Sequence, residues 1–352
     1  MAFAALYCHV YGKKTMKESA RALSLPKISI ITPSYNQGQY LAETISSIIS
    51  QQYANYELII IDAGSTDNTV EVIKQYEPYI AYWVSEPDRG QSHAIQKGLA
   101  VATGDIVNWI NSDDLVAPGT FHRIAAEFDL DRYNVICGYC DYFVEDLQHL
   151  DLRNRRMYVG ATVSASFLQR GINQPSTYFK TEVLKELSVD EQFHYAMDLD
   201  LWYRYLLLYG QRQIHLSEGL FSYFRLHGAS KSVADESRFA GDIGKVCYNV
   251  LFSLDMPQAL LAFVQLEITD PHFIPTRYPV KIPFEEVAEF VRRNAWEAVI
   301  YYNRTCQYAE ARACLAVARR AGQPLSTSVL RQYIKLYMVP KGVVRWFGGG
   351  GG

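Results

Sequence analysis

The 352-residue sequence has no surplus of basic charge, since 34 Lys and Arg residues stand against 37 Asp and Glu residues and the net charge is −3. A protein that binds nucleic acid mainly through its phosphates would normally carry such a surplus, so we expect no nucleic-acid partner. Hydrophobic residues make up 49% and charged residues 20%. This is the balance of a folded globular chain, long enough for one large domain with an appendage or for two domains.

Long hydrophobic runs are also missing. No segment offers the ~20 uncharged apolar residues that a membrane-spanning helix needs. The apolar residues 1–10 lack a basic start and are too short to span a bilayer. These features predict a cytoplasmic protein. The terminal run Gly348–Gly352 cannot pack a core and is interpreted as a tail.

Cysteines are few and scattered, six in all, and only Cys137 and Cys140 have the spacing of a zinc or redox half-site. A zinc site would need a second pair of ligands, and none follows at a suitable spacing. A redox pair would open a helix, whereas Tyr133–Val144 is rich in Val, Ile, Tyr and Phe and predicts a strand. We expect two buried cysteines without a chemical role.

The usual phosphate-binding loops are absent as well. No G-x-G-x-x-G follows the first predicted strand, and no G-x-x-x-x-G-K-[ST] occurs anywhere. These absences argue against a Rossmann dehydrogenase and a P-loop kinase.

What the sequence does contain is a regular alternation of strands and helices from Lys27 onward. The pattern predicts an α/β fold with a mostly parallel sheet and helices on both faces. The predicted strands are Ile28–Thr32, Tyr56–Ile61, Ile80–Ser85 and Asp105–Ile110, and the predicted helices are Leu41–Ser50, Asn68–Tyr76 and Gln91–Ala102.

Polar clusters follow three of these strands: Pro33–Gly38, Asp62–Asp67 and Asn111–Asp114. In parallel sheets, ligands bind beyond the carboxyl ends of the strands. The three clusters therefore predict one site at one edge of the sheet.

Each cluster allows a functional and a structural interpretation. Asp113 and Asp114 could share a divalent cation that carries a diphosphate, or form a solvated acidic turn. Asp62 could accept hydrogen bonds from a ribose or a base, or fix the turn that follows it, and the two roles are compatible. Asp67 is expected to cap the next helix. Tyr35 offers a ring that can stack on a flat base.

The combination of these motifs resembles the family-2 glycosyltransferases, which have the GT-A fold. The resemblance covers about residues 27–232 and is carried by four segments in the family's order and spacing: Thr32–Asn36, Asp62–Asp67, Gly98–Asp105 and Asn111–Asp114.

The resemblance implies an inverting transfer of a sugar from a nucleotide-diphosphate donor, assisted by Mg²⁺ or Mn²⁺. By this resemblance Pro33, Tyr35 and Asp62 hold the nucleoside, Asp113 contacts the ribose or the metal, and Asp114 ligates the metal. The donor could be linked to UDP, GDP or dTDP. The acceptor would be a hydroxyl group, on a lipid-linked molecule or another glycan.

Met197–Trp202 resembles the family's acidic motif, in which Asp198 stands at the general-base position. A helix N-terminus there would favour the ionised carboxylate that a base must be. The alternative makes Asp198 a helix cap. Asp200 and Trp202 are assigned to the acceptor side, or to the first turn and the core of the same helix. The family more often has an acidic residue where Met197 stands.

Three further segments extend the resemblance. In Arg225–Ser232, which resembles the family's closing loop, His227 would ligate the metal or contact the diphosphate. Arg225 and Lys231 would offset phosphate charge. Glu86–Gly98 matches the donor-side loop and helix, which assigns Gln91 to the donor, although His93 and Gln96 depart from the usual Asp and Asn. Gln174 falls where the acceptor side of the family lies, or in an ordinary turn.

The expected organisation is an N-terminal arm (1–25), a catalytic domain (26–235) and a helical C-terminal region (236–347). The catalytic domain would have a nucleotide half up to about residue 115 and an acceptor half after it. A helical hairpin is predicted from Phe284–Tyr302 and Tyr308–Ala321. Near the end, Lys335, Lys341 and Arg345 lie among apolar residues: Leu336, Val343, Trp346 and Phe347. This end suits a membrane surface, or packing against the catalytic domain or a second subunit.

Two other functions compete with glycosyl transfer. A sugar-phosphate nucleotidyltransferase would carry a Gly-rich, basic loop after its first strand, and Pro33–Gly38 has neither character. A non-catalytic nucleotide-sugar-binding module would have no need of both Asp198 and the Asp113-Asp114 pair.

Overall fold

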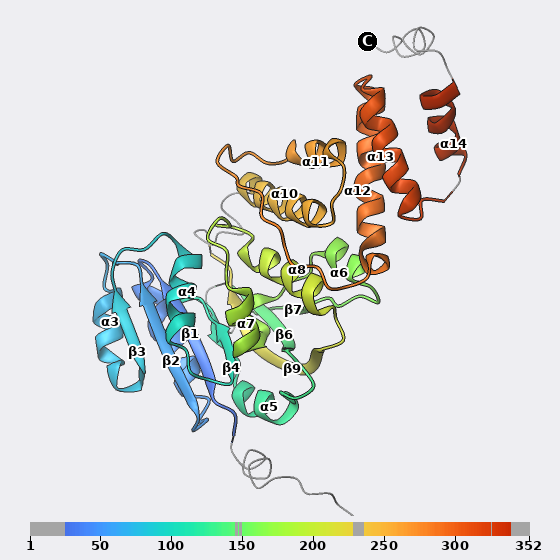
Figure 1. Ribbon diagram of the computed structural model, residues 1–352. Coiled ribbons are helices and arrows are strands. Elements are labelled where there is room, and N and C mark those ends of the chain that lie inside the picture. The colour runs from blue at the N-terminus through green and yellow to red at the C-terminus, as the bar shows by residue number, and fades with distance from the viewer. Residues whose placement is uncertain (1–24, 145–146, 148–149, 228–235, 325, 339–352) are drawn as a thin grey trace, which may run out of the picture.

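The computed structural model describes residues 25–144, 147, 150–227, 236–324 and 326–338. It shows a mixed α/β domain with a helical region stacked at one end (Figure 1). The predicted α/β fold class is confirmed.

One nine-stranded sheet runs through the α/β domain, in the order β3-β2-β1-β4-β8-β6-β9-β5, with β7 paired to β6 off this path. The strands are β1 (Ile28–Ser34), β2 (Tyr56–Asp62), β3 (Tyr82–Ser85), β4 (Ile106–Trp109), β5 (Leu115–Val116), β6 (Val135–Phe143), β7 (Leu150–Arg156), β8 (Thr177–Lys180) and β9 (Ile214–Arg225).

The predicted parallel arrangement holds for β3-β2-β1-β4 and for the pair of β6 with β9. The rest of the sheet is antiparallel, because β8 pairs with β4 and β6, β7 pairs with β6, and β5 pairs with β9. β6 and β7 follow each other along the chain through a short connection, which is the geometry of an antiparallel pair. The expectation of a mostly parallel sheet is therefore correct for the first half only.

Helices cover both faces of the sheet because its strands alternate apolar side chains between the two sides. In β1, Ile28 and Ile30 belong to one core cluster and Ile31 to the other, and all three are fully buried. The first core packs under α2 (Gly38–Ile49), α3 (Thr69–Gln75) and α5 (Thr120–Glu127). The second packs under α4 (Gln91–Val101), α6 (Val163–Gln169), α7 (Thr181–Leu187) and α8 (Met197–Tyr209). This period of two is what a strand buried on both faces requires.

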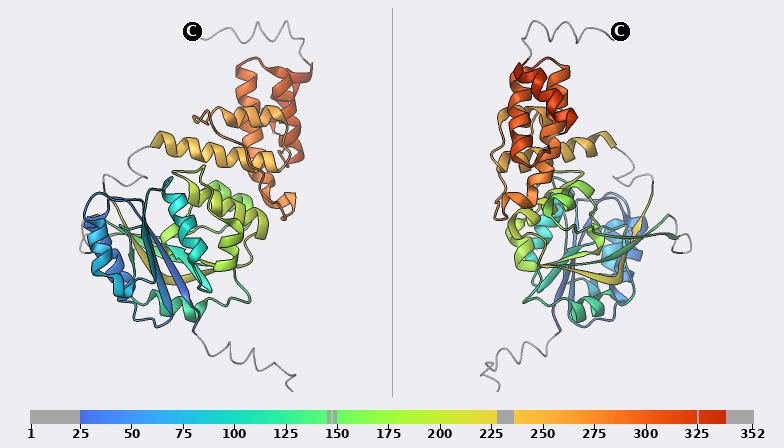
Figure 2. Two further views of the ribbon diagram at one scale, coloured as in Figure 1. Left: turned by 60° about the vertical axis from the view of Figure 1, so that its left-hand side comes forward. Right: turned by 90° about the vertical axis from the view of Figure 1, so that its right-hand side faces the viewer.

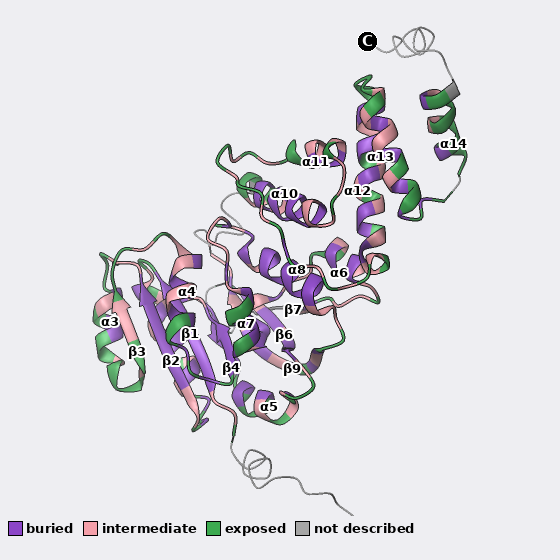
Figure 3. Cartoon of the chain, viewed as in Figure 1, coloured by how far each residue is buried: buried purple, intermediate pink, exposed green. Residues whose placement is uncertain are grey.

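The helical region consists of α10 (Glu236–Ser253), α11 (Gln258–Gln265), α12 (Phe284–Arg304), α13 (Tyr308–Arg320) and α14 (Thr327–Tyr333), which continues into a π-helical turn (Ile334–Met338). The views in Figure 2 show it stacked against the side of the domain that carries α6 and α8. α12 packs on α6 and α10 packs on α8, and their apolar side chains join one core. Figure 3 shows buried residues along these helices. The predicted hairpin of α12 and α13 is confirmed.

Cys137 and Cys140 are fully buried free cysteines in β6. Burial raises the pKa of each thiol to about 12. The structure thus agrees with the interpretation as strand cysteines.

No helix among the described residues has the length and hydrophobicity to cross a membrane.

The close packing of α4 on β1 predicts that Gly98→Ala will destabilise the fold. A Cβ atom at Gly98 would lie 2.4 Å from Cγ2 of Ile31, which is fully buried. Overpacking of this kind costs about 1–3 kcal/mol, more than the ~0.5–1 kcal/mol that alanine gains over glycine within a helix. Denaturant unfolding will measure the loss. Ala100→Gly, at an exposed position of the same helix, isolates the helix-propensity contribution. An unchanged or higher stability of Gly98→Ala would contradict the prediction.

Candidate active site

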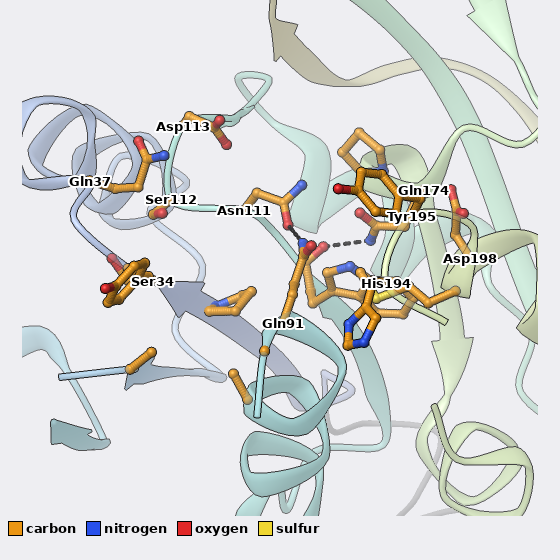
Figure 4. A pocket seen from close by; sticks show the side chains of 18 of the residues that line it. Ser34, Gln37, Gln91, Asn111, Ser112, Asp113, Gln174, His194, Tyr195 and Asp198 are labelled. Carbon is orange, nitrogen blue, oxygen red and sulfur yellow. Dashed lines mark hydrogen bonds between the residues drawn. The ribbon is translucent and has the colours of Figure 1, made fainter. Parts of the chain in front are cut away.

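A cavity of about 900 Å³ opens at the edge of the sheet where β1, β2 and β4 end. All three predicted polar clusters contribute to its wall, through Pro33, Ser34, Tyr35, Gln37, Ala63, Gly64, Asn111, Ser112 and Asp113. Figure 4 shows Gln91 near the middle of the cavity, between one side that carries Ser34, Gln37 and Asp113 and another that carries Gln174, Tyr195 and Asp198. The expectation of one site at one edge of the sheet is confirmed.

The strand register explains why the clusters meet. Ser34 in β1 stands opposite Asp62 in β2, and Asp62 stands opposite Ser85 in β3. Parallel strands in this register end at the same level, so the loops that follow them emerge side by side.

Hydrogen bonds in both directions join the loops after β1 and β2. The Asn36 N–H donates to Ser65 Oγ (2.8 Å), and the Thr66 N–H donates back to Asn36 Oδ1 (2.8 Å). The Gly38 N–H donates to Asp67 Oδ2 (3.0 Å), and the Gln37 N–H donates to Thr69 Oγ1 (3.1 Å). Asp67, predicted as a helix cap, also accepts the N–H of Thr69 (3.0 Å).

Asp62 stabilises the loop after β2 through hydrogen bonds and does not line the cavity. Its carboxylate is fully buried and accepts the N–H groups of Gly64 (3.1 Å) and Ser65 (2.9 Å) and the hydroxyl of Ser85 (2.5 Å). The turn role is thus seen in the structure, and the expected contact of Asp62 with the nucleoside stays a prediction. Pro33 and Tyr35 do line the cavity, and the Tyr35 side chain is 60% exposed.

The two adjacent carboxylates of the third cluster occupy different environments. Asp113 lines the cavity, and its Oδ2 lies 2.8 Å from Nε2 of His227. Asp114 is only 1% exposed, and it accepts the N–H of Arg225 (3.1 Å) and the amide of Asn111 (3.1 Å). Burial and the neighbouring Asp113 raise the pKa of Asp114 well above its usual value. The structure thus turns Asp113, and not the expected metal ligand Asp114, toward the cavity.

Arg225 lies beneath this cluster and does not line the cavity. It is 3% exposed, and its guanidinium pairs with Glu43 (2.5 Å) and donates to the carbonyl of Asp113 (3.0 Å). The same group lies over the ring of Tyr40, 4.8 Å from the centroid. Its expected contact with the donor is corrected to a supporting role for the Asp113 backbone. Lys231 lies outside the described residues.

Asp198 stands in the first turn of α8 and lines the cavity beside Tyr195 and Met197. Its Oδ1 accepts the N–H of Leu199 (2.8 Å). Burial raises the pKa of its carboxyl group to about 6. A carboxylate with such a pKa is ionised at neutral pH and holds a proton more readily than an ordinary Asp, which suits a general base.

The other acidic residue of this motif belongs to the core. Asp200 is fully buried, pairs with Arg204 (2.7 Å) and accepts the hydroxyl of Tyr278 (2.5 Å). Trp202 is 2% exposed and stacks on Tyr205 with a centroid distance of 5.3 Å. Neither lines the cavity. Asp200 lies on the opposite side of α8 from Asp198, because residues two apart are about 200° apart around a helix. Trp202 lies one turn further along the helix than Asp198. Their expected acceptor contacts are corrected accordingly.

Two glutamines predicted from the sequence do line the cavity. Gln91, at the start of α4, donates to Asn111 Oδ1 (2.6 Å). Gln174 donates to the carbonyl of Trp109 (2.7 Å) and to Asn108 Oδ1 (3.0 Å). Each bond ties the wall of the cavity to the end of β4.

Four buried polar atoms of cavity-lining residues have no protein partner within the described part of the chain: Ser34 Oγ, Gln37 Oε1, Asp88 Oδ2 and Trp109 Nε1. A buried polar group left unpaired costs about 1–3 kcal/mol, so such atoms ordinarily meet water or a ligand. Sequence reasoning did not single out these four residues. Ser34 and Gln37 belong to the first polar cluster, but Asp88 and Trp109 carry no signal that separates them from a turn acid and a core aromatic.

The sequence also gave no indication of Asp242, on α10. Asp242 is 4% exposed, and its Oδ2 accepts the N–H groups of His194 (3.0 Å), Tyr195 (2.8 Å) and Ala196 (3.3 Å). Its Oδ1 pairs with Lys245 (3.0 Å). The helical region thereby fixes the segment that leads into Asp198.

A divalent cation fits the site through Asp113 and His227. Their facing oxygen and nitrogen atoms are 2.8 Å apart, and Mn²⁺ accepts both carboxylate and imidazole ligands. The described residues hold no cluster of three or more His, Cys, Asp or Glu side chains placed to bind a metal. Further ligands would come from bound diphosphate and water, as is usual for Mg²⁺ at phosphate-binding sites.

Comparison with known proteins identifies relatives of this architecture. Residues 29–190 match the sequence family described as Glycosyl transferase family 2. An uncharacterized glycosyltransferase of Rickettsia typhi is 31% identical over 192 residues, which is 51% of this chain and 59% of that protein. Glycosyltransferase GlyG of Streptococcus pneumoniae is 26% identical over 265 residues, which is 68% of this chain and 86% of GlyG. The match thus spans less than two thirds of the Rickettsia protein.

Solved structures share the fold at low sequence identity. Staphylococcus aureus TarS 1-349 in complex with UDP-GlcNAc has a TM-score of 0.54 and 17% identity, over 87% of this chain and 91% of that chain. The mannosyltransferase PcManGT of Pyrobaculum calidifontis, in complex with GDP-Man and Mn²⁺, has a TM-score of 0.51 and 18% identity, over 93% and 84% of the two chains. These likenesses confirm the expected GT-A-like fold.

The contact of Asp242 with the start of α8 predicts that Asp242→Ala loosens the cavity wall. The substitution leaves three buried N–H groups without an acceptor, and we expect a loss of about 1–3 kcal/mol in the free energy of unfolding. Native-state hydrogen exchange should show faster exchange at the amides of residues 194–196. Asp131→Ala, at an exposed position after α5, is the matched control with little expected effect. Unchanged protection of these amides would contradict the assignment.

Proposed function

We propose that this chain, whose residues 29–190 match the model of glycosyl transferase family 2, transfers a sugar from a nucleotide-diphosphate donor to a hydroxyl acceptor with inversion of the anomeric configuration. The observation that carries the proposal is that Asp113 and Asp198 line one cavity, whose wall includes buried polar atoms that have no partner among the residues that the structure describes. When both substrates are held in one such cavity, the reaction between them becomes effectively unimolecular, which lowers its entropic cost.

The donor would lie along the side of the cavity formed by the loops after β1, β2 and β4. Tyr35 and Pro33 offer surfaces for the base. Ser34, Gln37 and Asp88 have the unpaired polar atoms that a nucleoside would satisfy. Gln91 stands beside them. Proteins of similar fold have been solved with UDP-GlcNAc and with GDP-Man. The proposed donor class is therefore a sugar linked to UDP, GDP or dTDP.

Asp113 and His227 would hold Mn²⁺ or Mg²⁺ against the diphosphate. This assignment moves the metal-ligand role from Asp114 to Asp113, because Asp114 is buried and accepts bonds from Arg225 and Asn111. A bound divalent cation supplies Lewis-acid stabilisation of the negative charge on a departing diphosphate. Asp114 and Arg225 would keep the Asp113 backbone in place.

Asp198 would act as the general base. The acceptor hydroxyl gives its proton to the carboxylate of Asp198 while its oxygen forms a bond to the anomeric carbon of the donor. The bond from that carbon to the diphosphate breaks, and the electron pair leaves with the diphosphate. One displacement inverts the anomeric centre and needs no covalent sugar–enzyme intermediate.

The two sides of the cavity follow the two halves of the domain. Residues 26–115 would hold the nucleotide, and residues 116–235 would supply Asp198 and the acceptor side, including Gln174. The product class would be a polysaccharide, a lipid-linked oligosaccharide or another glycan.

Calorimetric titration of UDP and GDP with and without Mn²⁺ tests the metal assignment. Asp113→Asn should remove most of the metal-dependent gain in nucleotide affinity, because it replaces a charged ligand by a neutral amide. Asp114→Asn is the matched control, and its metal dependence should persist because the Asp114 carboxyl group is turned away from the cavity. The reverse result, with metal dependence lost only in Asp114→Asn, would restore the role to Asp114.

The pH dependence of transfer tests the base. With a pKa of about 6 at Asp198, kcat/KM should fall roughly tenfold per pH unit below this value, since protonation removes the acceptor for the hydroxyl proton, and should level off above it. Asp198→Asn should bind donor normally, transfer the sugar ~10²–10⁴-fold more slowly and lose this pH dependence. Asp131→Asn, at an exposed site after α5, controls for the substitution itself. Near-normal transfer by folded Asp198→Asn would assign the base elsewhere.

A further inference from the structure

An exposed apolar stripe runs along α14 and the turn that continues it. Leu330, Tyr333, Ile334 and Tyr337 are 53%, 49%, 40% and 49% exposed. Their spacing of three, four and seven residues places them on one face of a helix. The rings of Tyr333 and Tyr337 stack on each other with a centroid distance of 4.6 Å. We call these four residues, together with the exposed Arg331, the α14 surface.

The opposite face of this segment is firmly packed. Val329 and Leu336 are 1% and 4% exposed and belong to the core that the helical region shares with the catalytic domain. Arg312 of α13 donates to the carbonyl of Leu336 (3.1 Å), and Asn303 of α12 donates to Gln332 (2.5 Å). The α14 surface is therefore held outward by a helix that is anchored on its other side. Leu336, one of the apolar residues that suggested a membrane-facing end, is part of this anchor.

Charge is distributed very unevenly along the chain. Residues 305–352 carry a net charge of +6, because Glu310 is their only acidic residue and seven are basic: Arg312, Arg319, Arg320, Arg331, Lys335, Lys341 and Arg345. Since the whole chain carries −3, residues 1–304 carry −9. Among the described basic residues, Arg331 and Lys335 lie on α14 and its turn, and Arg312 lies beside Leu336. Arg320, by contrast, lies over the ring of Phe284 at the start of α12. The apolar stripe is therefore accompanied by Arg312, Arg331 and Lys335 at the end of the helical region farthest from the sheet (Figures 1 and 2).

We propose that the α14 surface binds the face of an anionic lipid bilayer. Aromatic and aliphatic side chains beside Lys and Arg have the composition of a helix that lies in the membrane interface, where the rings enter the headgroup region and the cations meet anionic lipids. Four apolar side chains alone bind weakly, and the neighbouring cations Arg312, Arg331 and Lys335 supply the second attraction that stable binding to a bilayer needs.

A second copy of the chain fits this surface less well. In a two-fold symmetric dimer the same patch meets itself, so each copy would bring its own Arg331 and Lys335 to the contact. Like charges placed opposite each other oppose association, and Lys is depleted at protein interfaces. A bilayer with anionic headgroups offers the complementary charge.

Sedimentation of the full-length protein with phosphatidylcholine vesicles, with and without phosphatidylglycerol, tests the proposal. The protein should bind the vesicles that contain phosphatidylglycerol, bind neutral vesicles weakly, and dissociate as salt is raised. Arg331→Gln with Lys335→Gln should weaken binding at least about tenfold, since each basic residue near an anionic surface contributes about fivefold. Tyr333→Ser with Tyr337→Ser should also weaken it, by removing the stacked rings from the interface.

Matched controls lie on the far side of the molecule. Tyr79→Ser with Tyr82→Ser removes two tyrosines that are 54% and 44% exposed, and Lys74→Gln removes an exposed cation from α3. These variants should bind vesicles like the wild type, and thermal unfolding should show that all variants are folded. Failure of the wild type to bind anionic vesicles, or equal binding by the α14 variants, would overturn the proposal. Loss of self-association in the tyrosine variant without any vesicle binding would identify a subunit interface, which also overturns it.

Discussion

The carboxylate of Asp242 joins the two parts of the molecule at the point where chemistry is proposed to occur. One of its oxygen atoms accepts hydrogen bonds from the backbone N–H groups of the three residues before α8, and the other forms an ion pair with Lys245. Asp198 stands in the first turn of the same helix, so its position depends on a residue of α10, which lies outside the matched family segment. Tyr278 adds a second tie through Asp200. The helical region is therefore a structural part of the cavity, because contacts from both parts of the chain stabilise the cavity wall.

The two cavity carboxylates show how environment separates residues of one type. Asp113 lies beside His227 at the end of β4, among groups that suit a cation. Asp198 lies in a less polar part of the wall, where burial raises its pKa toward neutrality. A carboxylate of the first kind is placed to bind a cation together with the imidazole, whereas one of the second kind can take up a proton near neutral pH. Asp114 and Asp200 are both buried with partners and serve the fold.

The sequence was most informative where a pattern repeats over many residues. The alternation of apolar strands and helices in the sequence predicted β1 to β4 and the helices between them. Because parallel strands end at a common edge of the sheet, the sequence also predicted where the site lies. The antiparallel half could not be predicted, because the pairings of β8 with β4 and β6 join segments far apart in sequence. Side-chain direction was the other limit: adjacent aspartates such as Asp113 and Asp114 look alike in sequence, and only the Arg225 N–H shows which one is turned inward. Asp242 had no signal, since its partners are backbone groups about 46–48 residues away.

The bonds between the loops after β1 and β2 have a consequence for how the cavity meets its ligands. Asn36, Asp67 and their partners join the two loops as one unit, so this wall is already in its final shape before a nucleotide arrives. A preformed wall loses little conformational entropy on binding. Differences in affinity among nucleotides would then reflect the fit of each base and ribose to a fixed template, and any closing movement would have to come from the opposite wall, where Tyr195 stands.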